Sequence, residues 1–305
     1  MELSRRVAGC RGMLMEGALG TRLKQEYGIS FHEEVVMAPL VRTEQGREAL
    51  GALWSQYVEI ARRHGLPFLA TTPTRRANWE RMERASYGPD LFRDNVGFLK
   101  ALREKSPGEM YIGGLMGCRG DAYRGDQGLS AQEAQRFHSW QAAALAGSGV
   151  EFLYAGIMPT LPEALGMARA MGATGLPYLI SFMIRRDGRL LDGVPMREAI
   201  AAIEEGARPR PLCYLANCVH PSLVREALSQ PLTRDPLVVR RFMGLQANAS
   251  PLPPEELETS EALMTTAPDD LAREMLSLRD LCDFRIWGGC CGTDDRHMEA
   301  LARGI

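Results

Sequence analysis

The chain has 305 residues, 45% of them hydrophobic and 24% charged, which is ordinary composition for a globular protein. A formal charge of −2 offers no electrostatic basis for binding nucleic acid or an anionic membrane. Neither the apolar core of a signal peptide nor the roughly 18 apolar residues of a membrane helix occurs in the sequence. Seven cysteines spread along a chain of this length are typical of a reducing compartment, so we expect a cytoplasmic protein.

Eight short apolar runs recur along the chain, each bounded by glycine, proline or polar residues. Continuous apolar runs of this kind are typical of parallel strands that are covered on both faces. The runs span residues 13–16, 67–71, 110–115, 151–157, 177–184, 212–218, 241–248 and 284–290.

Amphipathic segments lie between the apolar runs. Residues 46–65 place apolar side chains largely on one side and end in basic residues and Gly65, which are signals of a helix C-terminus. Residues 130–149 begin with Ser130 and Glu133 at capping-box spacing. Further helices are expected at 161–175, 196–207, 221–230, 267–281 and 293–304. This alternation predicts an α/β protein with one (β/α)8 TIM barrel, a single domain over residues 1–305.

The longest irregular stretch, residues 250–270, is rich in proline and lies between the seventh strand and its helix. This position makes it a βα loop, at the face where such barrels carry their active sites. A flexible linker would also fit the composition, but we favour a loop that covers the site.

Three cysteines stand at the carboxyl ends of predicted strands. Cys218 ends the sixth strand, and Cys290 and Cys291 follow the eighth strand. One strand separates these two, a gap of roughly 10 Å, so side chains and loop backbone can bring three thiolates together. Gly288 and Gly289 would let the backbone turn tightly before the cysteine pair. Soft thiolates select zinc, and three of them leave one position for an exchangeable ligand.

Other interpretations of the cysteines stay open. His220 lies two residues after Cys218 and could complete a closed site of three cysteines and one histidine. Cys290 and Cys291 could instead form a redox pair, although adjacent cysteines close an awkward ring and no CxxC motif accompanies them. Packing or surface roles are expected for Cys10, Cys213 and Cys282.

The stretches EGALGTRL (16–23), NCVHP (217–221) and GGCCGTDDRHMEAL (288–301) together resemble the homocysteine S-methyltransferase family. That family comprises zinc-dependent barrels, among them betaine–homocysteine methyltransferase and the homocysteine module of cobalamin-dependent methionine synthase. The resemblance extends over nearly the whole chain. It implies a zinc ion bound by Cys218, Cys290 and Cys291, with the thiol of homocysteine as the fourth ligand.

The resemblance also implies residues that hold the acceptor. Glu16 stands where the family motif D-G-G/A-x-G-T has an acidic residue near the substrate amino group, and Gly17 follows it. A surface acid at a strand end is the alternative interpretation of Glu16. Asn217 directly precedes the metal cysteine and is expected to orient its loop or the substrate.

Two stretches depart from the family pattern. Many members have N-T-Y/F after the second strand, whereas this chain reads TTPTRRANW (71–79), in which Thr72 is a candidate substrate contact. At the fourth strand, members that use homocysteine commonly carry E-T-I-P, but this chain reads AGIMP (155–159), with Gly156 in place of the glutamate. Because that glutamate helps to hold the amino acid, its loss leaves a different thiol or a larger substrate open.

Further candidates stand at other predicted strand ends. Ser181 ends the fifth strand and Asn248 ends the seventh, so both are expected to contact the substrate. The glycine-rich stretch 113–126 resembles the family segment G-P-Y-G-x-Y, and Asp121 or Tyr123 is expected to line the site. Cys118 could be a thiol of the site, although we favour packing for it, and structural roles are expected for His138 and His297.

We therefore expect a zinc-dependent enzyme that transfers a methyl group from a small sulfonium or betaine-like donor to a thiol, by default homocysteine, which gives methionine. A zinc-containing barrel that binds or senses thiols without turnover is the second hypothesis. Hydrolysis by zinc-bound water, with Glu16 as the base, is the third. The expected partners are small molecules, with no nucleic acid and no membrane, and association into homo-oligomers stays open.

Overall fold

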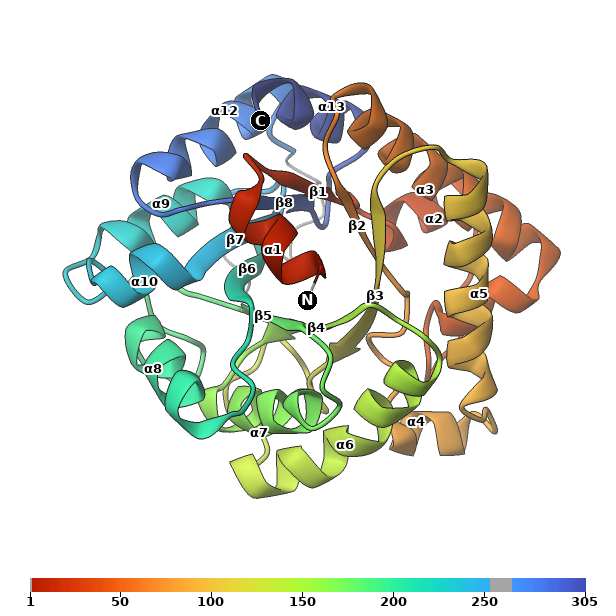
Figure 1. The fold of residues 1–305 in the computed structure, drawn as a ribbon, viewed down its shortest axis with the longest axis horizontal. Helices are drawn as coiled ribbons and strands as arrows, with labels where there is room; N and C mark the ends of the chain where they lie inside the picture. Colours follow the sequence, from red (N-terminus) through yellow and green to blue (C-terminus); the bar gives the residue numbers. More distant parts are fainter. Residues whose placement is uncertain (1, 253–264) are drawn as a thin grey trace.

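The computed structural model describes residues 2–252 and 265–305, which form a closed barrel of eight parallel strands (Figure 1). Each strand pairs with its sequence neighbours, and β8 closes the barrel against β1. The strands are β1 (Met13–Met15), β2 (Phe68–Thr71), β3 (Met110–Gly117), β4 (Phe152–Met158), β5 (Tyr178–Phe182), β6 (Cys213–Val219), β7 (Phe242–Ala247) and β8 (Ile286–Gly289). Every predicted apolar run overlaps one of these strands, so the predicted TIM barrel is confirmed.

Helices surround the strands as a ring (Figure 1). The predicted helical segments correspond to α3 (Glu44–Arg63), which begins two residues earlier than predicted, and to α6 (Ala131–Gly147), α7 (Leu161–Gly172), α8 (Met196–Gly206), α9 (Pro221–Ser229), α12 (Pro268–Leu276) with the 3₁₀ helix η2 (Ser277–Asp280), and α13 (Asp295–Gly304). The capping box predicted at the start of α6 is present. The Glu133 N–H donates to Ser130 Oγ at 3.3 Å, and the Ser130 N–H donates to the Glu133 carboxylate at 3.1 Å.

The structure adds helices that the sequence pattern had not indicated. They are α1 (Glu2–Gly9), α2 (Gly20–Tyr27), the 3₁₀ helix η1 (Ala38–Arg42), α4 (Trp79–Arg84), α5 (Asp90–Lys105) and α10 (Pro236–Arg241). Helix α5 completes the second βα unit and buries Leu91, Phe92, Val96 and Leu99 on one face. Because these apolar residues recur at helical spacing, hydrophobic periodicity was a sufficient signal for this helix.

Side chains alternate between the inside and the outside of the barrel along each strand. Inward-facing residues such as Met15 and Leu215 form one apolar cluster, while outward-facing residues pack beneath the helices. Helix α1 adds Leu3 and Val7 to the inner cluster and lies across the barrel opening in Figure 1. The amino-terminal end of the barrel is therefore closed by packing, which leaves the carboxyl end for a site.

Polar side chains replace apolar ones inside the barrel toward the carboxyl ends of the strands. The Tyr154 hydroxyl donates to Gln246 Oε1 at 2.8 Å and lies 3.5 Å from Asn217 Oδ1, and all three residues are buried. Each of these inward-facing groups satisfies part of another's hydrogen-bonding capacity, as buried polar groups require. This layer separates the apolar cluster from the carboxyl-end mouth of the barrel.

The predicted loop over the site, residues 250–270, lies largely at 253–264, which are outside the described residues. The Thr266 N–H donates to the Ala249 carbonyl at 2.8 Å, which ties the chain to the barrel just before α12. Among the helices of the described ranges, none is long and apolar enough to cross a membrane.

Candidate metal centre and acceptor site

Three thiols meet at the carboxyl end of the barrel. Cys218 belongs to the end of β6, and Cys290 and Cys291 follow β8 directly. The sulfur of Cys291 lies 3.6 Å from that of Cys218 and 4.0 Å from that of Cys290, and all three sulfurs lie within 4.8 Å of one another. Cys218 is buried, Cys290 is half-buried and Cys291 is exposed. The structure thus brings together the three cysteines that the sequence had selected.

The backbone of Cys218 is unusual for a residue with a side chain. Its φ is +60°, in the left-handed region, and the pairing of β6 with β7 shifts register between Asn217 and Val219. A left-handed conformation costs a non-glycine residue roughly 1 kcal/mol or more. The shift interrupts the strand's alternation at the point where the thiol leaves the barrel wall, as irregularities near sites often do.

Gly288 and Gly289 serve a different purpose from the tight turn that the sequence suggested. Both are residues of strand β8, and the left-handed turn comes later, at Gly292, with a φ of +77°. A Cβ at Gly288 would lie 2.8 Å from Met15 Cβ, and a Cβ at Gly289 would collide with the side chain of Thr293. Glycine is therefore needed at both positions because Met15 and Thr293 lie close to the backbone there. The tight turn predicted at these positions was wrong.

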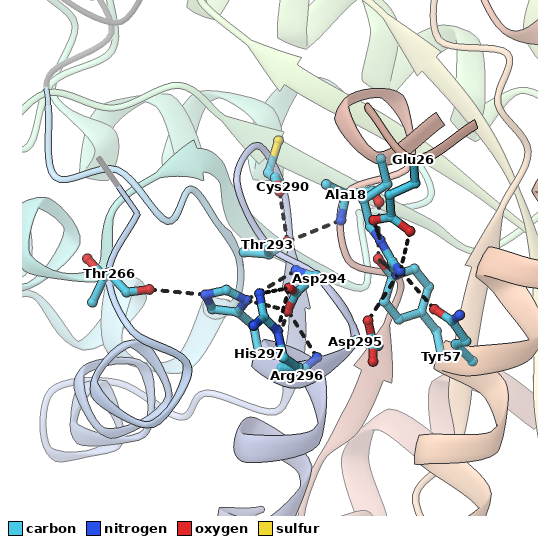
Figure 2. A network of polar contacts seen from close by, with 12 residues as sticks. Ala18, Glu26, Tyr57, Thr266, Cys290, Thr293, Asp294, Asp295, Arg296 and His297 are labelled. Carbon is cyan, nitrogen blue, oxygen red and sulfur yellow. Dashed lines mark hydrogen bonds and ion pairs between the residues drawn. The ribbon is translucent and has the colours of Figure 1, made fainter. Parts of the chain in front are cut away.

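A polar network holds the cysteine loop against its surroundings (Figure 2). Thr293 Oγ1 donates to the Cys290 carbonyl at 2.8 Å and accepts a hydrogen bond from the Ala18 N–H at 3.1 Å. Farther along, His297 contacts Asp294 at 2.7 Å and the Thr266 carbonyl at 3.0 Å. Ligand loops must be held rigidly to bind metal tightly. The contacts agree with the structural role expected of His297.

Two neutral hydrogen-bond donors lie against the sulfur of Cys218. The Tyr123 hydroxyl, in the loop after β3, is 3.2 Å from this sulfur, and Asn248 Nδ2, just after β7, is 3.5 Å from it. Asp121 positions the tyrosine, because its carboxylate accepts a hydrogen bond from the Tyr123 N–H at 2.9 Å. Tyr123 and Asn248, both candidates from the sequence, are thus placed to hydrogen bond to a thiolate.

The three thiols hydrogen bond to one another, and their pKa values shift in opposite directions. Hydrogen bonds from Cys290 and Cys291 hold the pKa of the Cys218 thiol well below its usual value. The hydrogen bond with Cys218 in turn raises the pKa of Cys290 well above its usual value and that of Cys291 to about 12. Three adjacent negative charges repel one another, so only a bound cation would let all three groups ionise near neutral pH.

The spacing of the three sulfurs matches a tetrahedral metal ion. Zinc–sulfur bonds of about 2.3 Å place two sulfur ligands about 3.8 Å apart. The distances from the Cys291 sulfur to those of Cys218 and Cys290, 3.6 and 4.0 Å, bracket that value. No other histidine, cysteine or carboxylate of the described ranges joins the three thiols. The cluster therefore fits one metal ion with three protein ligands.

His220 is directed away from the cysteines, so the closed site of three cysteines and one histidine is not formed. Its Nδ1 lies 2.7 Å from Ser222 Oγ, and its Nε2 lies 3.0 Å from Thr266 Oγ1. It also caps α9, accepting a hydrogen bond from the Ser222 N–H. Burial lowers the pKa of His220 to about 4, so the ring is neutral at physiological pH. Its role is to begin a helix.

Glu16 lies at the end of β1 with its side chain buried, so the alternative of a surface acid is wrong. Its carboxylate accepts hydrogen bonds from the hydroxyl and the N–H of Thr71. Burial raises the pKa of Glu16 from 4.5 to about 7. No cationic group of the described chain forms an ion pair with it. A bound ammonium group would therefore favour its ionised form.

Gly17, beside Glu16, is a position of close approach. A Cβ there would lie 2.7 Å from the hydroxyl of Tyr57, a buried residue whose hydroxyl donates to the Ala18 carbonyl at 3.0 Å. A side chain at this position would displace the tyrosine. Contact of Gly17 with a substrate stays a prediction.

Thr72 and Ser181 are both buried and hydrogen bonded within the protein. Thr72 Oγ1 lies 2.7 Å from Thr74 Oγ1 and accepts from the Leu115 N–H at 3.2 Å. Ser181 Oγ accepts from the Ile157 N–H at 2.9 Å, where β4 takes a left-handed φ of +59°. These contacts stabilise the ends of β3 and β4, and substrate contact by the two hydroxyls stays a prediction.

The carboxyl ends of β3 and β4 present two paired glycines. Gly117 and Gly156 are in register. Each lies two residues after an inward-facing residue of its strand, so both positions face the inside of the barrel. A Cβ at Gly156 would lie 2.9 Å from Leu115 Cδ1 and 3.8 Å from Asn217 Oδ1, so a side chain there would point into the barrel mouth. Gly156, which stands in place of the glutamate of the E-T-I-P pattern, therefore faces the site. Arg75, which sequence reasoning missed, lies over Gly117.

Tyr123→Phe is expected to weaken metal binding about tenfold, because it removes one of two donors to the Cys218 sulfur while keeping the ring. Competition with a chromophoric chelator would measure the affinity. Tyr178→Phe is the matched control, since it removes a hydroxyl that donates to the Pro209 carbonyl at the other end of the barrel. Equal affinities for the two variants would show that the tyrosine contact does not support the metal site.

The fold and site define a (β/α)8 barrel with a three-cysteine candidate metal centre at its carboxyl end. A family model described as homocysteine S-methyltransferase matches residues 13–305. The chain therefore belongs to the homocysteine S-methyltransferase family.

Two curated relatives support this membership. The homocysteine S-methyltransferase of Escherichia coli (strain K12) is 29% identical over 189 residues, which cover 60% of this chain and 56% of the relative. Homocysteine S-methyltransferase YbgG of Bacillus subtilis (strain 168) is 26% identical over 191 residues, with the same two shares. The chain thus spans little more than half the length of the curated relatives it matches.

Solved structures show the same fold. The metallated form of the homocysteine methyltransferase MmuM from Escherichia coli superposes with a TM-score of 0.77 over 100% of both chains, at 21% identity. Its oxidised form gives the same TM-score and identity over 99% of both chains. At this identity the likeness concerns the barrel.

Proposed function

We propose that this protein is a zinc-dependent S-methyltransferase that moves a methyl group from a small sulfonium or betaine-like donor to a thiol acceptor. Homocysteine is the default acceptor, and methionine is then the product. The observation that carries the proposal is the group of three thiols at the carboxyl end of the barrel, 3.6 and 4.0 Å apart along two sides, in a chain of this family.

The residues of the site suit this reaction. Zinc, when bound, would lower the pKa of the acceptor thiol so that it reacts as a thiolate. The hydrogen bonds of Tyr123 and Asn248 to Cys218 hold one ligand sulfur in place and withdraw charge from it, which disfavours methylation of the protein itself. Glu16, buried beside Thr71, is placed to hold an ammonium group of the acceptor.

The proposed transfer balances without a further reactant. The acceptor sulfur forms a bond to the methyl carbon while the bond from that carbon to the donor's sulfur or nitrogen breaks. The bonding electron pair leaves with the donor, which loses its positive charge, and the thiol proton passes to solvent. The barrel contributes orientation of the two reactants, and the buried polar layer below them limits access of water.

Methyl transfer by the zinc-loaded protein tests the proposal. Homocysteine is supplied with an S-methyl sulfonium donor in one assay and with glycine betaine in another, and products are identified by mass spectrometry. We expect methionine with one of the donors and none with the zinc-free protein. Tight binding of the thiol with no methylated product from any donor would instead support a thiol carrier or sensor.

We further propose that the protein works in the cytoplasm. All seven cysteines are free thiols, and the three at the metal centre must stay reduced to act as ligands. The small-molecule thiol and the methyl donor are its proposed partners.

A further inference from the structure

Arg75 carries a positive charge that has no partner among the described residues. It belongs to the loop after β2 and is half-buried. Among the arginines of the described chain that are not exposed, it is the one with no hydrogen bond or ion pair. Its neighbour Arg76, by contrast, donates to the Gly120 carbonyl at 2.8 Å. A shielded guanidinium without a partner is costly, and an anionic ligand would relieve that cost.

The side chain of Arg75 lies at the mouth of the barrel. A Cβ on Gly117 would be 2.7 Å from Arg75 Cγ and 3.5 Å from its Cδ, so the aliphatic stem crosses the inward-facing side of this glycine. Gly117 pairs in register with Gly156, which also faces inward. Because neither position has a side chain, the stem of Arg75 can lie where a larger residue at 117 would exclude it. The stem of Arg75 therefore lies at the same mouth as the thiols.

The mouth continues from Gly117 to the cysteines. Gly156, the partner of Gly117, would have a Cβ 3.8 Å from Asn217 Oδ1, and Asn217 directly precedes Cys218. A short molecule could therefore span from the cysteines to Arg75.

The acids of this region are already engaged. Asp121 accepts a hydrogen bond from the Tyr123 N–H at 2.9 Å. Glu163 is buried and contacts both the Arg119 N–H, at 2.7 Å, and His138, at 3.1 Å. At Gly156 there is no side chain to supply a carboxylate. Asp121 and Glu163 thus have other hydrogen-bond partners, and neither of them pairs with Arg75.

We propose that Arg75 is a specificity-determining residue that binds the carboxylate of the acceptor, so that the acceptor is a mercapto acid with its thiol at the cysteine cluster. This assignment rests on the proposed function for the position of the thiol. Paired hydrogen bonds between a guanidinium and a carboxylate are strong and geometrically specific. On the β3–β4 side of the site, Arg75 then binds the carboxylate of the acceptor, whereas Gly156 has no side chain that could bind its amino group.

Two analogues of homocysteine separate its charged groups. 4-Mercaptobutanoate lacks the amino group, and 3-aminopropanethiol lacks the carboxylate. Calorimetry with the zinc-loaded protein is expected to show that the acid binds at least about tenfold more tightly than the amine. Arg75→Gln, which keeps the aliphatic stem over Gly117, is expected to remove that preference, and Arg75→Lys to restore part of it.

The matched control is Arg124→Gln, in the loop after β3, where an exposed arginine is paired with Asp126 at 2.8 Å. This variant is expected to keep the preference for the acid. A preference that persists in Arg75→Gln, or wild-type protein that binds neither analogue, would overturn the assignment. So would an effect of Arg75→Gln confined to the affinity for a carboxylate-bearing donor such as glycine betaine.

The role of Arg75 and the proposed activity can be rejected independently of each other. If the acid preference is present in the wild type and lost in Arg75→Gln, the role of Arg75 is supported even when no methyl transfer occurs, and only the proposed activity is then rejected. If methyl transfer occurs with equal KM for acidic and uncharged thiols in both proteins, the activity stands and the role of Arg75 is rejected.

Discussion

Cys290→Ser is expected to lose its metal and keep its fold. A hydroxyl is a poor ligand for zinc at neutral pH, and two remaining thiolates do not hold the ion tightly. The loop itself depends on backbone contacts that serine preserves, such as the Cys290 N–H donating to the Ala247 carbonyl at 2.7 Å. Metal analysis should fall from about one zinc per chain to near zero. Methyl transfer should fall with it.

Cys10→Ser provides the matched control for this substitution. Cys10 is a free, half-buried cysteine that follows α1 at the opposite end of the barrel. Its variant should retain both metal and activity, and circular dichroism should show the same helix content for both variants. If folded wild-type protein takes up no zinc when it is supplied, the metal centre and the methyltransferase proposal are both wrong.

Glu16→Gln is expected to stabilise the metal-free protein at alkaline pH and to leave its stability unchanged at acidic pH. Because burial raises the pKa of Glu16 from 4.5 to about 7, the folded protein retains a proton that the unfolded chain releases between these values. Wild-type stability therefore declines as pH rises from 4.5 to 7. A shift of this size corresponds to about 3 kcal/mol as an upper estimate. Glutamine does not ionise, so the Glu16→Gln variant lacks this contribution to the pH dependence of stability.

Denaturant unfolding at pH 4.5, 6 and 8 measures this effect. The difference between variant and wild type should grow with pH and level off above about 7. Glu48→Gln, which removes a carboxylate from an exposed position of α3, controls for the change in net charge. A stability difference that is the same at all three pH values would show that the Glu16 carboxyl group is not shielded from water.

Local patterns were sufficient to predict most of the fold. Apolar runs located the strands because both faces of a parallel barrel strand are buried, and Ser130 with Glu133 located the start of α6. Helix α5 had an equally clear periodicity and was overlooked. The position of helix α1 across the end of the barrel could not be predicted from local sequence, because it depends on contacts of Leu3 and Val7 with distant strands.

The site was predictable in its ligands and less so in its surroundings. Cys218, Cys290 and Cys291 were identifiable because thiol chemistry and strand-end position are both visible in a sequence. Gly288 and Gly289 were misinterpreted: glycine is needed there because Met15 and Thr293 lie close, and not because the chain turns. His220 was open as a ligand until its ring was found against Ser222 and Thr266.

The sequence by itself determined which segments form the buried strands, where helix α6 begins and which side chains can bind a soft metal, because these follow from local periodicity and from side-chain chemistry. Tertiary structure alone decided which of those side chains meet. Closure of the barrel brings Tyr123 to within 3.2 Å of the Cys218 sulfur and places Arg75 over Gly117. Such contacts join residues far apart in the chain, so they depend on strand order, register and backbone rotation at single residues, which no local pattern records.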